Sequence, residues 1–282
     1  MTHATHKHRG CRFSYQLDGS GPPVVLIQGV GVHGAGWTPQ VEALRDSFEC
    51  LMFDNRGMAQ SQPRGVPITV EQMAEDTAAL MDHLGWESAH MVGHSLGGLV
   101  ALHLALTVPT RARSLSLLCT CARGRDATRL SWRMLWLGLR SRIGSRRMRR
   151  RAFLQIVMPP QELAGADPDV MAARLEPLFG HDIADQPPVA MTQLAALRAY
   201  DATPRLHEIA GIPTLVVSAA HDLIAPPRSG RALAQGIAGA RYVEFGAASH
   251  GVPIQRAGDV NEVLLEHLGS CGDIRDGVAG GA

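Results

Sequence analysis

Short apolar runs rich in β-branched residues recur along the chain and alternate with stretches of helical periodicity. Such runs are typical of strands, and apolar positions that recur every third or fourth residue are typical of helices. The pattern predicts strands at 13–17, 24–28, 49–53, 89–92, 114–118, 213–218 and 241–245. It predicts helices at 41–46, 70–84, 96–106, 230–238 and 257–268. Runs that are apolar throughout fit strands buried on both faces, so we expect an α/β fold with a mostly parallel, doubly wound sheet.

The alternation stops between residues 122 and 203, which carry helical patterns but no convincing strand. A connection of this length is too long for a plain loop, so we interpret 122–203 as a helical cap inserted into the core. The core is then formed by 1–121 and 204–269. The glycine-rich stretch 270–282 is predicted to be a disordered tail. The His-rich first ten residues are predicted to be a frayed end, without the apolar centre of a secretory signal.

One turn carries the strongest signal for catalysis. The segment Gly93-His94-Ser95-Leu96-Gly97 follows a predicted strand and precedes a predicted helix. This is the setting in which G-x-S-x-G forms a nucleophile elbow. The glycines leave room around a serine held in a tight turn, and the amides at the start of the helix favour negative charge beside it. In this setting we interpret Ser95 as a nucleophile rather than as part of an ordinary Gly/Ser turn.

Four more segments match landmarks of one known family. They are an early glycine-rich loop, a turn like D-x-R-G-x-G-x-S, a loop with an aspartate and a loop with a histidine, at 26–37, 53–61, 217–227 and 248–251. Together with the elbow they make the chain resemble the α/β-hydrolase superfamily, here a serine esterase-like member with a helical cap. The resemblance covers nearly the whole chain, and Ser95, Asp222 and His250 follow the order expected for this fold.

The resemblance implies a role for each residue of this trio. Ser95 would attack the substrate carbonyl, and it needs a neighbouring base because a serine hydroxyl is a weak nucleophile. His250 would take the serine proton and later protonate the leaving group, while Asp222 would hold the histidine in the correct tautomer. The negative charge that develops on the carbonyl oxygen needs preorganised donors. We expect these oxyanion-hole donors to be the backbone amides of Leu96 and, by the resemblance, Val30.

The early glycine-rich loop also supplies the expected substrate contacts, namely Gly29, His33 and Trp37. Many relatives with this fold carry histidine where this chain has Gln28, so we expect Gln28 to replace its supporting hydrogen bonds. Ala59 stands at the second glycine of the D-x-R-G-x-G-x-S turn. Since alanine tolerates a positive φ poorly, we expect a local change of backbone conformation at Ala59.

The basic residues are unevenly distributed. Lys7 is the only lysine, which argues against lysine-based chemistry such as a P-loop or a Schiff base. The segment 123–151 holds eleven arginines against one acid, Asp126, although the net charge of the chain is only +1. Three interpretations stay open: a solvated helix face, attraction of an anionic substrate or carrier, and association with anionic lipid. No recognition motif accompanies the charge, so no nucleic-acid partner is expected. An apolar stripe beside these arginines is expected to pack into the core, and it consists of Trp132, Leu135, Trp136 and Leu139.

The cysteines and the apolar runs set the expected environment. The five cysteines are odd in number and include no C-x-x-C pair, so they suggest neither a disulfide framework nor a zinc site. They favour a reducing, cytoplasmic location. Cys119 and Cys121 are expected to pack in the core at the end of a strand. No apolar run reaches the roughly 18 residues of a membrane span. No metal or other cofactor is expected.

Together these features predict a serine hydrolase that cleaves carboxylic esters with an apolar acyl group through an acyl-enzyme intermediate. A C–C bond hydrolase, a lactonase or an acyltransferase with the same triad stays open, because the cap chooses the substrate and the acceptor. A non-catalytic binding protein of the same fold is the alternative from a different class. It is disfavoured because all three triad candidates are present.

Overall fold

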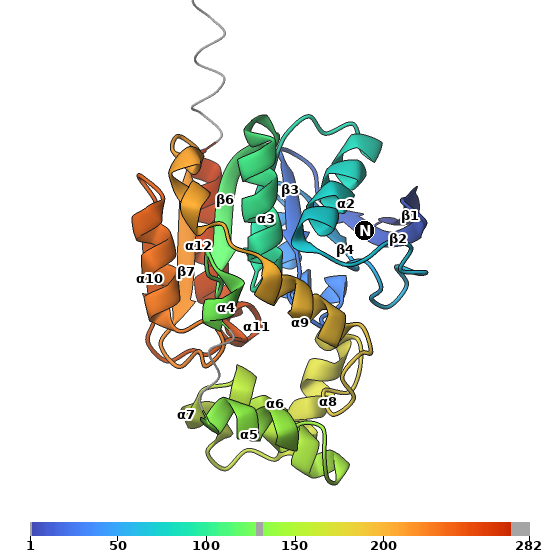
Figure 1. Cartoon of the computed structure of the whole chain (residues 1–282), viewed down its shortest axis with the longest axis vertical. Coiled ribbons are helices and arrows are strands. Elements are labelled where there is room, and N and C mark those ends of the chain that lie inside the picture. Colours follow the sequence, from blue (N-terminus) through green and yellow to red (C-terminus); the bar gives the residue numbers. More distant parts are fainter. Residues whose placement is uncertain (1, 128–131, 272–282) are drawn as a thin grey trace, which may run out of the picture.

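Within residues 2–127 and 132–271, which the computed structural model describes, an eight-stranded sheet has the order β1-β2-β4-β3-β5-β6-β7-β8 (Figure 1). The strands from β3 to β8 pair in parallel, whereas β2 is antiparallel to both β1 and β4. The bounds are β1 Thr2–His8, β2 Cys11–Asp18, β3 Pro23–Ile27, β4 Glu49–Phe53, β5 Ala89–His94, β6 Ala112–Leu118, β7 Thr214–Ala219 and β8 Arg241–Phe245. The predicted α/β fold with a mostly parallel sheet is therefore confirmed.

The N-terminal end, predicted to fray, forms the edge strand β1 instead. It pairs antiparallel with β2 along its whole length. The sequence did not predict this strand because β1 is polar and contains no apolar run. Only the alternating burial of its side chains identifies it as a strand. The His6 ring also stacks on the His83 ring with 4.3 Å between centroids, which fixes β1 against α2 (Val70–His83). A polar edge strand is a common protection against pairing with other chains.

Helices cover both faces of the sheet and bury its apolar side chains. On one face, α1 (Thr38–Leu44) and α12 (Ala257–Ser270) pack against one apolar cluster. On the other face, α2, α3 (Leu96–Thr107) and α10 (Pro227–Gly236) pack against a larger one. Successive strand residues point to opposite faces, which explains why the central strands are apolar throughout. Among the described helices, none is long and apolar enough to cross a membrane.

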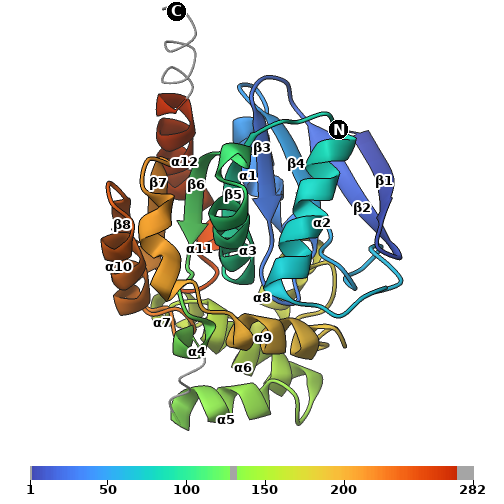
Figure 2. The same cartoon turned by 45° about the horizontal axis from the view of Figure 1, so that its top comes forward.

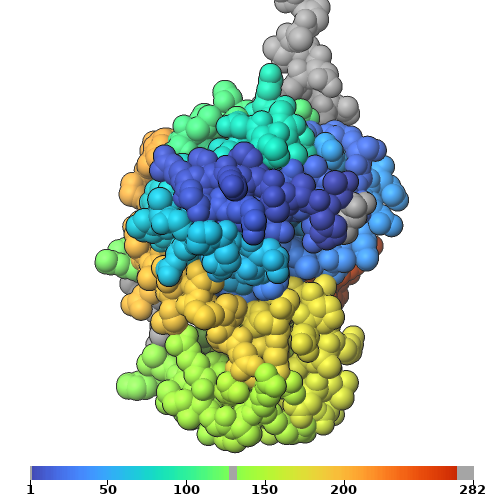
Figure 3. Space-filling view, turned by 90° about the vertical axis from the view of Figure 1, so that its right-hand side faces the viewer, coloured from blue at the N-terminus to red at the C-terminus, as the bar shows by residue number. Residues whose placement is uncertain are grey.

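Between β6 and β7 the chain leaves the sheet and forms a group of helices beyond it (Figure 1 and Figure 2). The helices are α4 Gly124–Ala127, α5 Trp132–Arg140, α6 Arg146–Val157, α7 Pro160–Leu163, α8 Pro168–Phe179 and α9 Ala190–Ala199. They occupy the segment predicted as the cap, and α6 and α8 share an apolar cluster of their own. Figure 3 shows this part as the lower portion of the molecule, away from the N-terminal strands. Of the predicted tail, Ser270 ends α12, and 272–282 lie outside the described residues.

Two backbone hydrogen bonds tie the cap to loops of the core. The Gly251 amide donates to the Val157 carbonyl at 2.9 Å, which joins the histidine loop to the end of α6. The His33 amide donates to the Phe179 carbonyl at 3.4 Å, which joins the early glycine-rich loop to the end of α8. A short helix, α11 (Val252–Gln255), follows the histidine loop. The helices between β6 and β7 therefore contact the early glycine-rich loop and the histidine loop.

Ala59 has a positive φ of 37°, although a side chain disfavours this region. The backbone thus keeps a left-handed conformation that suits glycine, and the local change expected at Ala59 is not seen. We predict that Ala59→Gly raises the free energy of unfolding by up to about 1 kcal/mol, because relief of strain outweighs the extra freedom of the unfolded chain. Urea unfolding measures the difference. The control Ala79→Gly, within α2, should destabilise by about 1 kcal/mol, and destabilisation by both changes would contradict the prediction.

Candidate active site

Ser95 lies in the tight turn between β5 and α3. Its backbone has φ 54° and ψ −115°, a conformation that side chains rarely adopt. The Ser95 amide donates to the Leu118 carbonyl at 2.9 Å, and the Thr120 hydroxyl donates to the Ser95 carbonyl at 2.7 Å. Both partners lie at or just after the end of β6. The neighbouring strand therefore holds the strained turn, as a nucleophile elbow requires.

Close backbone contacts explain the glycines of the elbow. A Cβ on Gly93 would lie 2.4 Å from the Gly97 carbonyl oxygen. A Cβ on Gly97 would lie 2.0 Å from the Ile27 carbonyl oxygen. Both distances are far shorter than a van der Waals contact, so any side chain would push the turn apart. The spacing G-x-S-x-G is thus set by the approach of α3 and β3 to the elbow.

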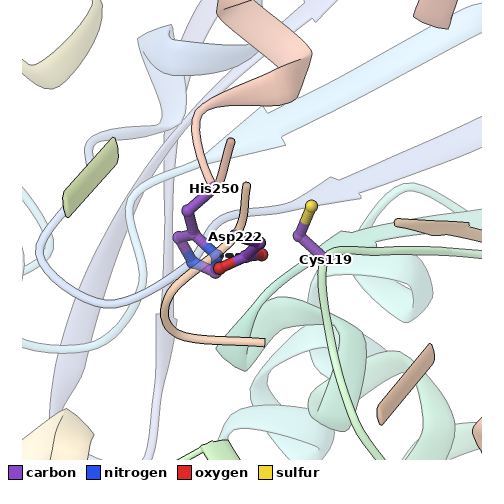
Figure 4. A group of neighbouring side chains, drawn as sticks. All are labelled: Cys119, Asp222 and His250. Atoms are coloured by element: carbon purple, nitrogen blue, oxygen red, sulfur yellow. Dashed lines mark hydrogen bonds and ion pairs between the residues drawn. The ribbon is translucent and has the colours of Figure 1, made fainter. Parts of the chain in front are cut away.

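His250 and Asp222 meet in the loops that follow β8 and β7 (Figure 4). Nδ1 of His250 lies 2.8 Å from Oδ2 of Asp222, and both side chains are buried. The other oxygen of Asp222 accepts the amides of Ile224 and Ala225 at 2.7 and 2.9 Å. Because a carboxylate accepts, Nδ1 carries the proton, which leaves Nε2 of the neutral ring as a base. The structure thus brings together the predicted acid and the predicted histidine.

His94, which precedes the nucleophile, supports the histidine loop. Its Nε2 lies 2.9 Å from the His250 carbonyl oxygen, and the two rings are 4.8 Å apart between centroids. A carbonyl only accepts, so Nε2 of His94 carries a proton. Burial lowers the pKa of His94 to about 3, and the charge of His250 adds to the shift. His94 is therefore neutral and acts as a positioning residue for His250.

Acid should destabilise the protein through His94. The pKa of His94 is about 3 in the folded chain and about 6.5 in an unfolded one, so between these values the unfolded chain binds more protons. Stability therefore falls as the pH drops through this window. Between pH 7 and pH 5 we expect His94→Gln, which keeps an N–H donor, to lose roughly 2 kcal/mol less stability than the wild type. Urea unfolding at the two pH values measures this, and equal losses in both chains would contradict it.

Cys119 lies beside the His250–Asp222 pair (Figure 4). Its Sγ, an oxygen of Asp222 and a ring nitrogen of His250 all lie within 4.8 Å of one another. Burial raises the pKa of the Cys119 thiol well above its ordinary value, and the Asp222 carboxylate adds to the rise. The thiol therefore stays protonated, which suits neither a metal ligand nor a nucleophile. Cys119 packs in the core as expected, but its contact with the acid was missed, since only its place directly after β6 hinted at it.

The segments predicted to supply the oxyanion hole both border Ser95. Leu96 is the first residue of α3, and the first amides of a helix have no acceptor within it. Gly29 approaches so closely that a Cβ there would lie 3.1 Å from the Cβ of Ser95, and Val30 follows it directly. The start of a helix and a glycine-rich loop therefore frame Ser95. Such framing lets two backbone amides point at one developing charge.

Two glutamines hold the early glycine-rich loop. Oε1 of Gln28 accepts the Gly29 amide at 3.2 Å, in the supporting role expected for it. Oε1 of Gln193, on α9 of the cap, accepts the Gly31 amide at 2.9 Å, and Gln193 is fully buried. Gln193 was missed because the contact joins residues far apart in the chain, and one glutamine in a helix carries no signal. The loop next to Ser95 is thus fixed by the core and by the cap.

The other predicted substrate contacts lie in different places. His33 lies at the junction with the cap, where its ring centroid is 5.9 Å from that of His181, and it lines a cavity of about 220 Å³. Trp37 is fully buried in the core and meets the His94 ring edge-on, with 6.5 Å between centroids. Trp37 therefore packs behind the elbow and does not make the predicted substrate contact. Gly29 lies beside Ser95.

A cavity of about 440 Å³ lies between the cap and the core, beside Asp222. The cap contributes Arg133 and Gln155 to its lining, and the core contributes His221. Apolar parts of its wall are formed by Met158, Leu163 and Leu223. The volume suits a small molecule. Of the three triad candidates, Asp222 is the one that lines this cavity within the described residues.

Four of the five arginines of α6 form ion pairs inside the cap. Their partners are aspartates of α8 and its flanking residues, in the pairs Arg146–Asp182, Arg146–Asp185, Arg147–Asp167, Arg147–Asp169, Arg149–Asp185, Arg150–Asp169 and Arg150–Asp182. Hydrogen bonds from Arg150 lower the pKa of Asp182 to about 2. Much of the positive charge noted in the sequence is therefore balanced within the cap.

Comparison with known families agrees with this geometry. The model of the alpha/beta hydrolase fold matches residues 22–257, which span the elbow, the acid loop and the histidine loop. The chain therefore belongs to the α/β-hydrolase fold family, as its resemblance implied.

Similar proteins carry hydrolase names. A protein of Azorhizobium caulinodans named "Putative carbamate hydrolase RutD" is 30% identical over 263 residues, which are 92% of this chain and 95% of that protein. The enol-lactonase of Burkholderia xenovorans LB400 is 30% identical, with a TM-score of 0.78 over 94% of this chain and 99% of that chain. A thermophilic esterase of Thermogutta terrifontis is 25% identical, with a TM-score of 0.77 over 96% of this chain and 99% of that chain. These similarities support a hydrolase.

Proposed function

We propose that this protein is a serine hydrolase that cleaves small carboxylic esters through an acyl-enzyme intermediate. The proposal is carried by one arrangement: a strained elbow serine, Ser95, whose neighbour His94 contacts the His250 backbone, and a buried His250–Asp222 pair that leaves a basic ring nitrogen. The relative named as an esterase points in the same direction.

In this proposal each group has one step. Oγ of Ser95 attacks the carbonyl carbon while Nε2 of His250 removes its proton, and Asp222 stabilises the imidazolium that forms. The amides of Leu96 and Val30 stabilise the negative charge on the carbonyl oxygen. The imidazolium then protonates the departing alcohol, and the acyl group remains on Ser95. Water then gives a proton to His250 and attacks the acyl carbon. The bond between this carbon and Oγ of Ser95 breaks, the imidazolium returns its proton to Oγ, and the acid leaves.

Lactone and carbamate hydrolysis are the second candidates. They are favoured by the names of the relatives from Burkholderia xenovorans and Azorhizobium caulinodans. The same acyl-enzyme serves all three substrates, because each offers a carbonyl carbon with an oxygen or nitrogen leaving group. An anionic substrate is a variant of the proposal, since Arg133 brings a positive charge to the cavity wall.

A serine-reactive probe and a substrate panel test the proposal. A fluorophosphonate should label Ser95, and p-nitrophenyl acetate or butyrate should be hydrolysed faster than a matched lactone or carbamate. If the lactone or the carbamate were turned over faster, the substrate class would change from ester to that compound, and the protein would still be a serine hydrolase. No labelling and no turnover in any class would overturn the proposal in favour of a binding protein.

A further inference from the structure

The outer face of α5 is apolar although it faces solvent. Four large apolar side chains of α5 and one from the turn after it are exposed, and we call them the α5 surface: Trp132, Leu135, Trp136, Leu139 and Ile143. The exposed fraction reaches 88% for Trp132 and 57% for Trp136. The opposite side of α5 carries Leu137, which is buried in the cap cluster. The expectation that this stripe packs into the core is therefore wrong. Figure 1 and Figure 2 place α5 at the end of the molecule away from the sheet.

The segment that forms the α5 surface carries arginines and no acid. The segment 132–143 contains Arg133, Arg140 and Arg142 but neither aspartate nor glutamate. The Arg140 guanidinium lies 5.6 Å from the centroid of the Trp136 ring. Within the part of the chain that the structure describes, these three arginines form no ion pair, in contrast to four of the arginines of α6. The α5 surface thus combines an apolar stripe with unpaired positive charge.

We propose that the α5 surface binds the surface of an anionic lipid bilayer. Amphipathic helices with tryptophan and leucine on one face and arginine beside them lie at the boundary between headgroups and acyl chains. The apolar side chains enter this boundary, and the arginines meet the phosphate groups. An exposed apolar patch of this kind marks an interaction site. A second copy of the chain fits less well, because a twofold contact would bring the same arginines together without acids to pair them.

The position of α5 gives this binding a consequence for the cavity. Arg133 belongs to the same helix and also lines the cavity of about 440 Å³ beside Asp222. Docking through the α5 surface therefore brings the cavity close to lipid, from which apolar molecules can be drawn. The binding itself does not rest on the proposed activity, because the stripe and its arginines are properties of the surface alone.

Vesicle flotation with the whole chain tests the proposal. The protein should float with vesicles of phosphatidylcholine and phosphatidylglycerol, much less with phosphatidylcholine alone, and salt should release it. The variant Trp132→Ser/Trp136→Ser should bind at least about tenfold more weakly, because it loses apolar area that enters the bilayer. The variant Arg140→Gln/Arg142→Gln should bind roughly 25-fold more weakly, from about fivefold for each arginine near the surface.

Two controls of matched chemistry lie on the core. Val108→Ser removes another exposed apolar side chain, and Arg228→Gln removes an exposed arginine of α10; neither should change binding. The tryptophan variant should keep the circular dichroism spectrum and the Tm of the wild type, which separates loss of binding from loss of fold. The proposal would be overturned if the wild type did not bind anionic vesicles, or if the folded tryptophan variant bound them as well as the wild type. The proposal would also be overturned if the wild type sedimented as a dimer with or without vesicles while the tryptophan variant sedimented as a monomer.

Discussion

Replacing Ser95 by alanine should lower kcat for an ester substrate by roughly 10⁴- to 10⁶-fold. The change removes the oxygen that forms the acyl-enzyme and leaves the turn in place. The turn is held by the amide and the carbonyl of Ser95, which bond to Leu118 and Thr120, so alanine keeps both contacts. KM should therefore change far less than kcat. Steady-state kinetics with p-nitrophenyl butyrate measure both constants, and the fluorophosphonate should no longer label the protein.

The matched control for this change is Ser116→Ala. Ser116 lies in β6, is fully buried, and its hydroxyl has no hydrogen-bond partner within the described residues. Its replacement should leave kcat within about twofold of the wild type, because it lies in the sheet and not in the elbow. If Ser95→Ala kept more than about a tenth of the wild-type rate, Ser95 would not be the nucleophile. A large loss in both variants would instead indicate damage to the fold.

The sheet could be predicted because buried parallel strands leave a strong pattern in the sequence. The runs 49–53 and 241–245 agree with β4 and β8 at both ends. The strand β1 could not be predicted in this way, because its residues are polar and its pairing with β2 makes it a strand. Local patterns therefore reveal elements that bury apolar side chains, and they miss an edge strand stabilised by backbone pairing.

The candidate site also contains residues that local patterns reveal and residues that they miss. Ser95, Asp222 and His250 could be proposed from short motifs, because each motif is contained in one loop. Cys119 and Gln193 could not, because each reaches the site through a contact between distant parts of the chain. The cap was hardest to predict for a related reason. Helical spacing identifies an apolar stripe on α5, but spacing does not say whether the stripe faces a core or solvent.

Replacing Arg56 by methionine should lower the free energy of unfolding by about 3–5 kcal/mol. Arg56 and Asp76 are almost fully buried, with Nε of Arg56 2.8 Å from Oδ2 of Asp76 and Nη2 bonded to Oδ1. Nη1 of Arg56 also donates to the carbonyl oxygens of Arg64 at 2.6 Å and Arg9 at 3.2 Å. The substitution therefore leaves a buried carboxylate without its charged partner and detaches the β1–β2 turn from the core. Urea unfolding at neutral pH measures the loss.

The pH dependence of this loss separates its two causes. Burial raises the pKa of Asp76 even beside Arg56, and without the guanidinium the folded chain should hold a proton on Asp76 more readily still. A folded state that binds more protons than the unfolded state gains stability as the pH falls. Relative to the wild type, Arg56→Met should therefore recover stability from about pH 8 to about pH 5, and Arg56→Met/Asp76→Leu should not. The double variant should also lose less at about pH 8 than the two single losses combined, because no buried charge remains unpaired. Equal, pH-independent losses in Arg56→Met and the double variant would contradict this and assign the effect to the detached β1–β2 turn.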